Sequence, residues 1–202
     1  ACMARHFAAS GAHVIIAGRR KSALEAVAEG CSTIYPYACD VTQEMAVADL
    51  FDFAEGKGMT QPAADIVIAN AGIAASAPLD KTDRGLWDQI IAVNLTGPFL
   101  TLREGLLRMK AANCQQGRLI AIASMTAKRA YPYISAYTAS KHGVLGLVKS
   151  AALEVAALRT GVSGSAQKNI TVNAICPGYL DTEMTQSSIA NIAEKTGLSS
   201  EQ

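Results

Sequence analysis

Three side chains of this sequence have the types and the spacing of a proton-transfer site. Tyr137 precedes Lys141 by four residues, and Ser124 lies thirteen residues before Tyr137. Residues four apart share one face of a helix, and residues 136–144 are typical of a helix start. A phenol has an ordinary pKa near ~10, and a neighbouring ammonium favours the phenolate and lowers that pKa. We therefore predict that Tyr137 is a general acid or base and that Ser124 donates a hydrogen bond to a substrate oxygen. The alternative is an ordinary exposed pair on a helix surface.

Two arginines follow the first apolar run of the chain. Gly18 stands where a dinucleotide-binding sheet would carry an acidic residue for the ribose hydroxyls, and Arg19 and Arg20 come next. Arginine at this point accommodates the 2′-phosphate of NADP. The pattern favours NADP as the cofactor, with NAD as the second choice. The alternative is a basic helix cap that faces solvent.

Three further segments place small or polar residues where a binding site needs them. Asn70-Ala71-Gly72 follows an apolar run directly, and small residues there let the backbone approach a flat ligand. Asn94 lies with Gly97 inside a helical pattern, which predicts a local kink that places a polar group in the site. Pro177-Gly178 follows the last apolar run, and Thr182 would hydrogen-bond the cofactor. Each segment has a plain alternative, either a turn or a tolerated irregularity.

Apolar runs of strand length alternate with longer amphipathic stretches. Continuous apolar runs are typical of parallel strands covered on both faces, and the alternation predicts an α/β fold with a doubly wound sheet of Rossmann type. Ligands of such folds bind beyond the carboxyl ends of the strands, where the motifs above fall. We predict strands at 13–17, 33–37, 65–69, 118–123 and 170–175, and helices near 1–9, 21–30, 43–56, 83–110, 136–159 and 183–195.

The composition argues against several kinds of protein. Half of the 202 residues are hydrophobic, 17% are charged and the net charge is +1, so we expect neither disorder nor a nucleic-acid partner. No apolar run reaches the ~18–20 residues of a membrane span, and residues 1–7 lack a signal-peptide layout. Five scattered cysteines without a Cys-x-x-Cys pair predict reduced thiols in a cytoplasmic protein. The three histidines have no ligand companions, so we expect no metal.

Taken in order, these motifs resemble those of the short-chain dehydrogenase/reductase family across essentially the whole chain. The matching pieces are Asp40-Val41, Asn70-Ala71-Gly72, Asn94, Ser124, Tyr137-x-x-x-Lys141 and Pro177-Gly178 with Thr182. The resemblance implies a catalytic tetrad. Tyr137 would be the proton donor or acceptor, while Lys141 would lower its pKa and hold the nicotinamide ribose. Ser124 would orient the carbonyl, and Asn94 would position a water that relays protons to Lys141.

The resemblance also implies how the cofactor is held. Asp40 and Val41 would contact the adenine, and the backbone from Asn70 to Gly72 would flank the adenosine ribose. The family begins with a strand and a glycine-rich turn that hold the pyrophosphate, whereas residues 1–8 resemble the helix that follows that turn. We expect the missing strand to lie between the strands at 13–17 and 65–69, and the closing helix and strand to lie beyond residue 202. Residues 1–202 would then be a fragment forming one nucleotide-binding domain, with a substrate loop at about 178–202.

The resemblance implies an NADP(H)-dependent oxidoreductase that interconverts a carbonyl and a secondary alcohol. The chain is similar to bacterial 3-oxoacyl reductases and 3-hydroxyacyl-CoA dehydrogenases, and Lys128 and Arg129 are candidates for contacts with the phosphates of an acyl carrier. Another small ketone, a sugar or a steroid is the alternative substrate. From other classes, a non-catalytic nucleotide-binding regulator would need no tyrosine–lysine pair, and an epimerase would carry a larger substrate domain. A homotetramer or homodimer is expected from the family.

Overall fold

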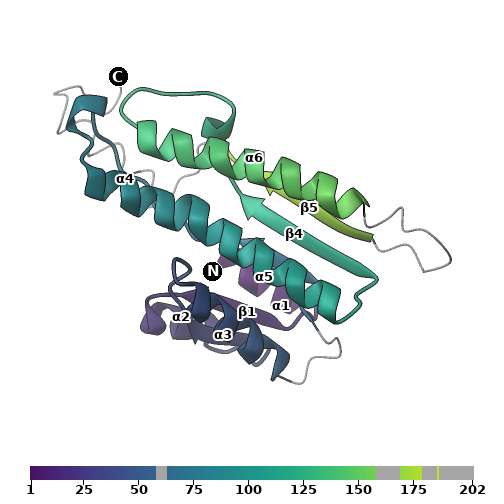
Figure 1. Ribbon diagram of the computed structural model, residues 1–202. Helices are drawn as coiled ribbons and strands as arrows, with labels where there is room; N and C mark the ends of the chain where they lie inside the picture. The colour runs from purple at the N-terminus through teal and green to yellow at the C-terminus, as the bar shows by residue number, and fades with distance from the viewer. Residues whose placement is uncertain (58–62, 158–168, 179–185, 187–202) are drawn as a thin grey trace.

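The computed structural model describes residues 1–57, 63–157, 169–178 and 186, which form helices packed on parallel strands (Figure 1). The strands are β1 (Val14–Gly18), β2 (Ile34–Ala38), β3 (Ile66–Ala69), β4 (Gln116–Ile122) and β5 (Asn169–Ile175). The α-helices are α1 (Cys2–Ala9), α2 (Lys21–Ala28), α3 (Glu44–Glu55), α4 (Arg84–Ile91), α5 (Gly97–Ala111) and α6 (Ser135–Ala157), with the short turns η1 (Leu79–Lys81), η2 (Ala92–Thr96) and η3 (Met125–Ala127). The predicted α/β architecture is confirmed, whereas the helix expected at 183–195 falls almost wholly outside the described residues.

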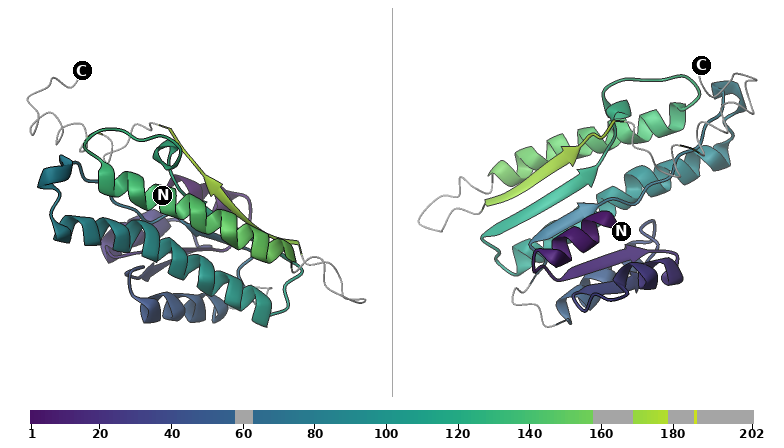
Figure 2. Two further views of the ribbon diagram at one scale, coloured as in Figure 1. Left: turned by 45° about the horizontal axis from the view of Figure 1, so that its top comes forward. Right: turned by 180° about the vertical axis from the view of Figure 1, so that it is seen from behind.

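The five strands form two parallel sheets. β1 pairs with β2, from Val14 opposite Ile34 to Gly18 opposite Ala38. In the second sheet, β4 lies between β3 and β5. The two views of Figure 2 show both sheets with their arrows running in the same general direction, so the carboxyl ends of the strands lie at one end of the molecule. Within the described residues β1 and β3 are not paired with each other, as the sequence predicted for these two strands.

One face of the second sheet is covered by α5 and α6, and the core lies between them. Alternate residues of β4 are buried, including Leu119 and Ala121, because successive side chains of a strand point to opposite faces. Gly105 allows α5 to pack closely against β3, since a Cβ at this position would lie only 3.0 Å from Cγ2 of Val67 on that strand. Helix α6 also contributes to this core through Val144 and Val148, which lie four residues apart on one face of the helix and are both buried.

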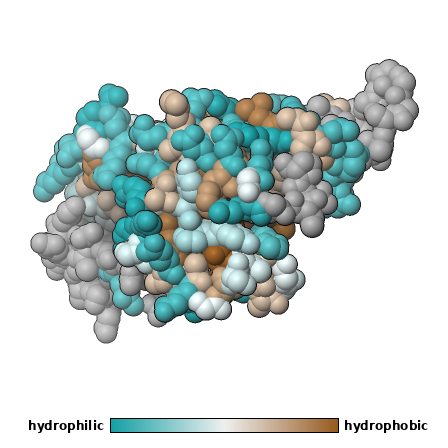
Figure 3. All heavy atoms as spheres, turned by 90° about the horizontal axis from the view of Figure 1, so that it is seen from below, coloured by the Kyte–Doolittle hydropathy of each residue, from teal (hydrophilic) through white to brown (hydrophobic). Residues whose placement is uncertain are grey.

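The other half of the molecule is built around β1 and β2, with α2 and α3 beside them. α3 buries Val47 and Phe51, four residues apart, and turns its carboxylates outward. Figure 3 views the molecule from this side and shows hydrophilic side chains around smaller apolar patches. Within the described part of the chain, no helix has the length and apolar character to cross a membrane.

The helix predicted at 83–110 is interrupted. α4 passes into the π-helical turn η2, which contains Asn94, and the chain then continues as α5. A π-helical turn is a common site of irregularity next to functional residues, because its wider hydrogen bonding shifts one side chain out of the regular helical positions. The local irregularity predicted beside Asn94 is thus confirmed, and Asn94 itself is fully buried.

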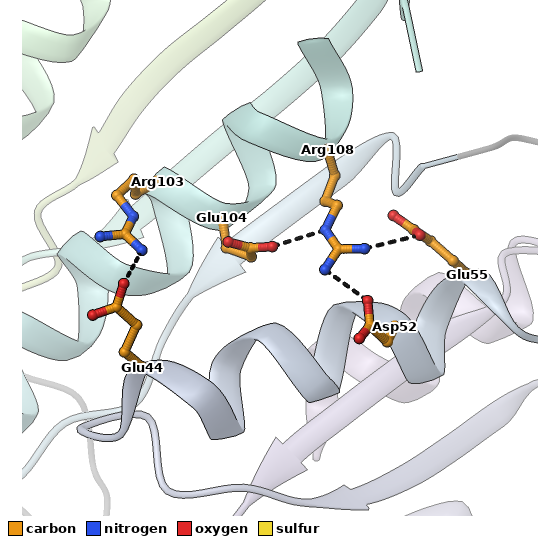
Figure 4. A network of polar contacts seen from close by, with 6 residues as sticks. All are labelled: Glu44, Asp52, Glu55, Arg103, Glu104 and Arg108. Carbon is orange, nitrogen blue, oxygen red and sulfur yellow. Dashed lines mark hydrogen bonds and ion pairs between the residues drawn. The ribbon is translucent and has the colours of Figure 1, made fainter. Parts of the chain in front are cut away.

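An ion-pair network connects α3 to α5 (Figure 4). The guanidinium of Arg108 on α5 lies 2.7 Å from Asp52 and 3.0 Å from Glu55, both on α3, and 2.7 Å from Glu104 on its own helix. Arg103, five residues earlier on α5, pairs with Glu44 at the start of α3. Because α3 packs in the half containing β1 and α5 on the sheet containing β3, the network ties together two halves whose strands are not paired.

We expect Arg108→Ala to destabilise the fold by about 2 kcal/mol, because it removes three charge-assisted contacts and leaves the mostly buried Glu104 without its cation. Arg84→Ala is a matched control, since Arg84 pairs with Asp88 at the surface with 86% of its side chain exposed. That pair should contribute at most about 0.5 kcal/mol. Urea unfolding of both variants measures the difference. Equal losses would show that the network does not hold the halves together.

Candidate active site

The motifs predicted from sequence gather at the carboxyl ends of the strands, as expected for an α/β fold. Arg19 and Arg20 follow β1, Asp40 and Val41 follow β2, Asn70, Ala71 and Gly72 follow β3, Ser124 follows β4, and Pro177 and Gly178 follow β5. Thr182 lies outside the described residues, as does most of the substrate loop expected at about 178–202.

Ser124 and Tyr137 form the centre of this region. Ser124 caps η3, where its Oγ accepts a hydrogen bond of 3.2 Å from the amide of Thr126. Tyr137 lies in the first turn of α6, and the hydroxyl of Ser124 is near enough to its phenol to lower the pKa of Tyr137. The structure therefore brings together two hydroxyls that are thirteen residues apart in the sequence.

The pKa of Tyr137 differs from the expectation. Burial raises the pKa of the phenol above its ordinary value, and the hydrogen bond with Ser124 only partly opposes this effect. The prediction that Lys141 lowers the pKa of Tyr137 is wrong for this structure. The amine of Lys141 lies 5.7 Å from the centroid of the Tyr137 ring, and burial lowers its own pKa to about 8, so its positive charge is lost only as the pH rises above neutral.

Lys141 lies on the same face of α6 as Tyr137, as the spacing predicted. Only 4% of Lys141 is exposed, and its Nζ donates a hydrogen bond of 2.9 Å to the carbonyl of Ile122 at the end of β4. Burial disfavours the charged amine and lowers the pKa of Lys141 to about 8. A group with this pKa gains and loses its proton within the range of pH in which enzymes work.

Asn94 lies beside the lysine, held by the loop that follows β3. Its Oδ1 accepts a hydrogen bond of 2.8 Å from the amide of Ile73, and its Nδ2 donates one of 2.8 Å to the carbonyl of Ile73. A Cβ built on Gly72 would lie 3.4 Å from Oδ1 of Asn94 and 3.7 Å from Nζ of Lys141. These three residues are therefore neighbours, while the role of Asn94 in holding a water stays a prediction.

The residues predicted to contact the nucleotide form a second group at the ends of β1 and β2. Oδ1 of Asp40 accepts hydrogen bonds from the amide and the hydroxyl of Thr42, at 3.0 and 2.8 Å. These bonds lower the pKa of Asp40, and the charge of Arg19 lowers it further. Val41 packs against the start of α5, since a Cβ on Gly97 would come within 2.9 Å of its Cγ2. Arg19 and Asp40 are thus close enough to act on one ligand.

Sequence reasoning missed Ser140 and the loop residue Ile73. Ser140, which lies between Tyr137 and Lys141 in the sequence of α6, is fully buried. Nδ2 of Asn94 donates a hydrogen bond of 3.3 Å to its Oγ. A serine three residues after Tyr137 was visible in the sequence, but its partner 46 residues away was not. In the described part of the chain, no group of His, Cys, Asp and Glu side chains could hold a metal ion.

The comparisons with known proteins agree with this arrangement. Residues 1–193 match the short chain dehydrogenase family, and the chain belongs to that family. An uncharacterized oxidoreductase of Bacillus subtilis is 36% identical over 198 residues, which are 95% of this chain and 70% of that protein. A D-beta-hydroxybutyrate dehydrogenase of Rhizobium meliloti is 34% identical over 99% of this chain and 74% of its own length. Membership confirms the predicted enzyme class, an oxidoreductase that acts on CH–OH groups.

Two solved structures resemble the whole arrangement. An actinorhodin polyketide ketoreductase variant, determined with NADPH, superposes with a TM-score of 0.85 at 27% identity and covers 98% of this chain and 72% of its own. Sorbitol-6-phosphate 2-dehydrogenase of Erwinia amylovora superposes with a TM-score of 0.83 at 30% identity, over 99% of this chain and 75% of that one. The predicted fold of Rossmann type is confirmed by these likenesses.

We expect one lysine of this chain to titrate near pH 8 when lysine side chains are followed by NMR. Because burial lowers its pKa, Lys141 should be protonated below about pH 8 and neutral above it. The signal should disappear in Lys141→Met and persist in Lys149→Met, which changes an exposed lysine of the same helix. Titration of every lysine above pH 10 would contradict the assigned burial.

Proposed function

We propose that this chain binds a nicotinamide dinucleotide and interconverts a carbonyl and a secondary alcohol. The observation that carries the proposal is the half-buried phenol of Tyr137 with the hydroxyl of Ser124 near enough to lower its pKa, and with the buried amine of Lys141 one turn further along α6. Two hydroxyls side by side fit one carbonyl oxygen, which can accept a hydrogen bond from each. The family membership and the ketoreductase determined with NADPH support the same reaction class.

The residues at the strand ends fit a dinucleotide. Asp40 and Arg19 lie together where an adenosine would be held, and Gly72 keeps the space beside Lys141 free of a side chain. Lys141 would hold the nicotinamide ribose through hydrogen bonds from its amine. When bound, the nicotinamide supplies or accepts the hydride. The remaining chemistry belongs to side chains of this chain.

Tyr137 is suited to give up a proton during reduction. Its raised pKa keeps the phenol protonated at neutral pH, so the proton is held at Oη until a carbonyl oxygen gains negative charge. Ser124 stabilises that charge as a hydrogen-bond donor. Because the amide of Thr126 already donates to Oγ of Ser124, the serine hydrogen is directed away from the backbone, toward the phenol or a substrate oxygen.

The buried amine of Lys141 can stabilise the negative charge that remains on Tyr137 when the phenol loses its proton. While Tyr137 is neutral, burial makes a charged lysine unfavourable, which is why its pKa falls to about 8. A phenolate formed at Tyr137 would favour the ammonium, since an opposite charge nearby stabilises it. At neutral pH the phenol is thus uncharged before the reaction, and the lysine, which is mostly protonated there, can compensate for the negative charge that appears during it.

NADP is the cofactor we propose, because Arg19 and Arg20 follow β1 directly and Gly18 replaces an acidic side chain there. For the substrate, we propose a 3-oxoacyl thioester. A 3-oxoacyl-[acyl-carrier-protein] reductase of Rickettsia bellii is 31% identical over 91% of this chain, which supports that class. Lys128 and Arg129 are exposed just after η3, and the guanidinium of Arg129 lies 5.6 Å over the ring of Tyr131. The two cations suit the phosphates of an acyl carrier.

We expect Tyr137→Phe to lower turnover of a carbonyl substrate at least about a hundredfold, because the general acid is lost. The affinity for NADPH should change little. Acetoacetyl-CoA, a simple ketone, a sugar and a steroid serve as substrates, with NADPH oxidation followed by absorbance. Tyr35→Phe, remote from this region, should leave turnover unchanged. Undiminished turnover in Tyr137→Phe would remove the phenol from the mechanism.

Cofactor choice depends on the arginines. We expect replacement of Arg19 and Arg20 by serine to weaken NADPH binding at least about tenfold, since charge-assisted hydrogen bonds to the 2′-phosphate are lost. NADH binding should change less than about twofold, because NADH lacks that phosphate. Fluorescence titration of both nucleotides measures the ratio. Equal losses for NADPH and NADH would exclude specific recognition of the phosphate.

A further inference from the structure

We propose that Ser140 is a positioning residue for the reaction, because it locks the amide of Asn94 to the helix that carries Tyr137 and Lys141. The proposal rests on the proposed function, since it assigns a role within the same site. It is carried by a chain of hydrogen bonds between side chains that are fully buried.

The orientation of the Asn94 amide is fixed by the backbone of Ile73. The amide hydrogen of Ile73 needs an oxygen, so Oδ1 lies opposite it at 2.8 Å, and Nδ2 must then face the carbonyl of Ile73, also at 2.8 Å. This leaves Nδ2 with one further hydrogen. That hydrogen points to Oγ of Ser140 at 3.3 Å, so the full donor capacity of Asn94 is used.

Ser140 can accept this bond because its own hydrogen is already committed. Its hydroxyl donates to the backbone carbonyl of Tyr137 at 2.7 Å, one turn earlier on α6. A lone pair of Oγ is thereby turned toward Asn94. The serine thus connects the π-helical turn η2 and the loop after β3 to the backbone of the residue that holds the catalytic phenol.

The connection matters because Asn94 borders the lysine site. Its Oδ1 and Nζ of Lys141 both approach the position that a Cβ of Gly72 would occupy, at 3.4 and 3.7 Å. Packing adds to the hydrogen bonds, since a Cβ on Gly143 of α6 would come within 2.9 Å of Leu95 in η2. Without the hydroxyl of Ser140, one buried hydrogen of Asn94 loses its acceptor, and the amide must move to regain one.

The test compares Ser140→Ala with Ser150→Ala in the full chain. Both change a serine of α6, but Ser150 is exposed and contacts only Glu154 in the hydrogen bonds described for it. Hydrogen exchange of the Ile73 amide, measured by NMR, should accelerate at least about tenfold in Ser140→Ala, because Asn94 is released, and should not change in Ser150→Ala.

Kinetics separate positioning from stability alone. In Ser140→Ala we expect kcat for carbonyl reduction to fall roughly tenfold with KM for NADPH unchanged, because alignment is lost and cofactor contacts are not. In a cycle with Asn94→Ala, the double variant should be no slower than Asn94→Ala alone, since Ser140 acts through that amide. Losses that multiply, or an unchanged exchange rate at Ile73, would overturn the proposal.

The two proposals fail in different ways. If the unaltered chain reduces no carbonyl of the substrate panel, the proposed function fails, while hydrogen exchange at Ile73 still reports the network without any substrate. If the unaltered chain is active and Ser140→Ala keeps its full kcat, the proposed function stands and the role of Ser140 is refuted.

Discussion

The site depends on the requirement that buried polar groups be paired. Lys141 and Asn94 lie in the interior, where an amine or an amide without partners is costly. Each partner that satisfies them belongs to a different element: the carbonyl of Ile122 ends β4, Ile73 follows β3, and Ser140 is on α6. The hydrogen bonds that make burial tolerable are therefore the same bonds that fix the relative positions of the strand ends and the helix.

Burial acts in opposite directions on the two groups of α6. It raises the pKa of an acid such as Tyr137 and lowers the pKa of a base such as Lys141, so both move toward their neutral forms. At neutral pH the phenol is then uncharged, while Lys141, with a pKa of about 8, is still mostly protonated. Negative charge appears in such a site only as a bond to the substrate oxygen forms, where the hydroxyl of Ser124 and the ammonium can stabilise it.

Because the described strands form two separate sheets, the two halves of the molecule must be held together by contacts other than strand pairing. The strands of each half are joined by hydrogen bonds within their own sheet. The contact between the halves passes through helices, including the ion pairs of Arg108 on α5 with α3. Arg19 and Asp40, which are predicted to contact the nucleotide, lie in one half, and the residues of α6 lie in the other. A ligand that spans both groups would itself add to the connection between the halves.

The sequence by itself determined the order of elements and the end of the sheet at which the site lies. Apolar runs and helical periodicity are local signals, and the i, i+4 spacing is enough to place Tyr137 and Lys141 on one face of a helix. The interruption beside Asn94 was also predicted, because asparagine and glycine are poor residues for a helix interior. The motifs resembling a known family extended these local signals to most of the site.

Only the tertiary structure decided the protonation of the site and the partners of its buried groups. Spacing suggested that the lysine lowers the pKa of the phenol, but the depth of burial, which no local pattern encodes, raises it instead. The bond between Asn94 and Ser140 joins residues 46 apart, and the sequence gives no sign of which pairs will meet. Contacts of this kind exist only once the sheet and α6 have packed, since their geometry depends on every element between them.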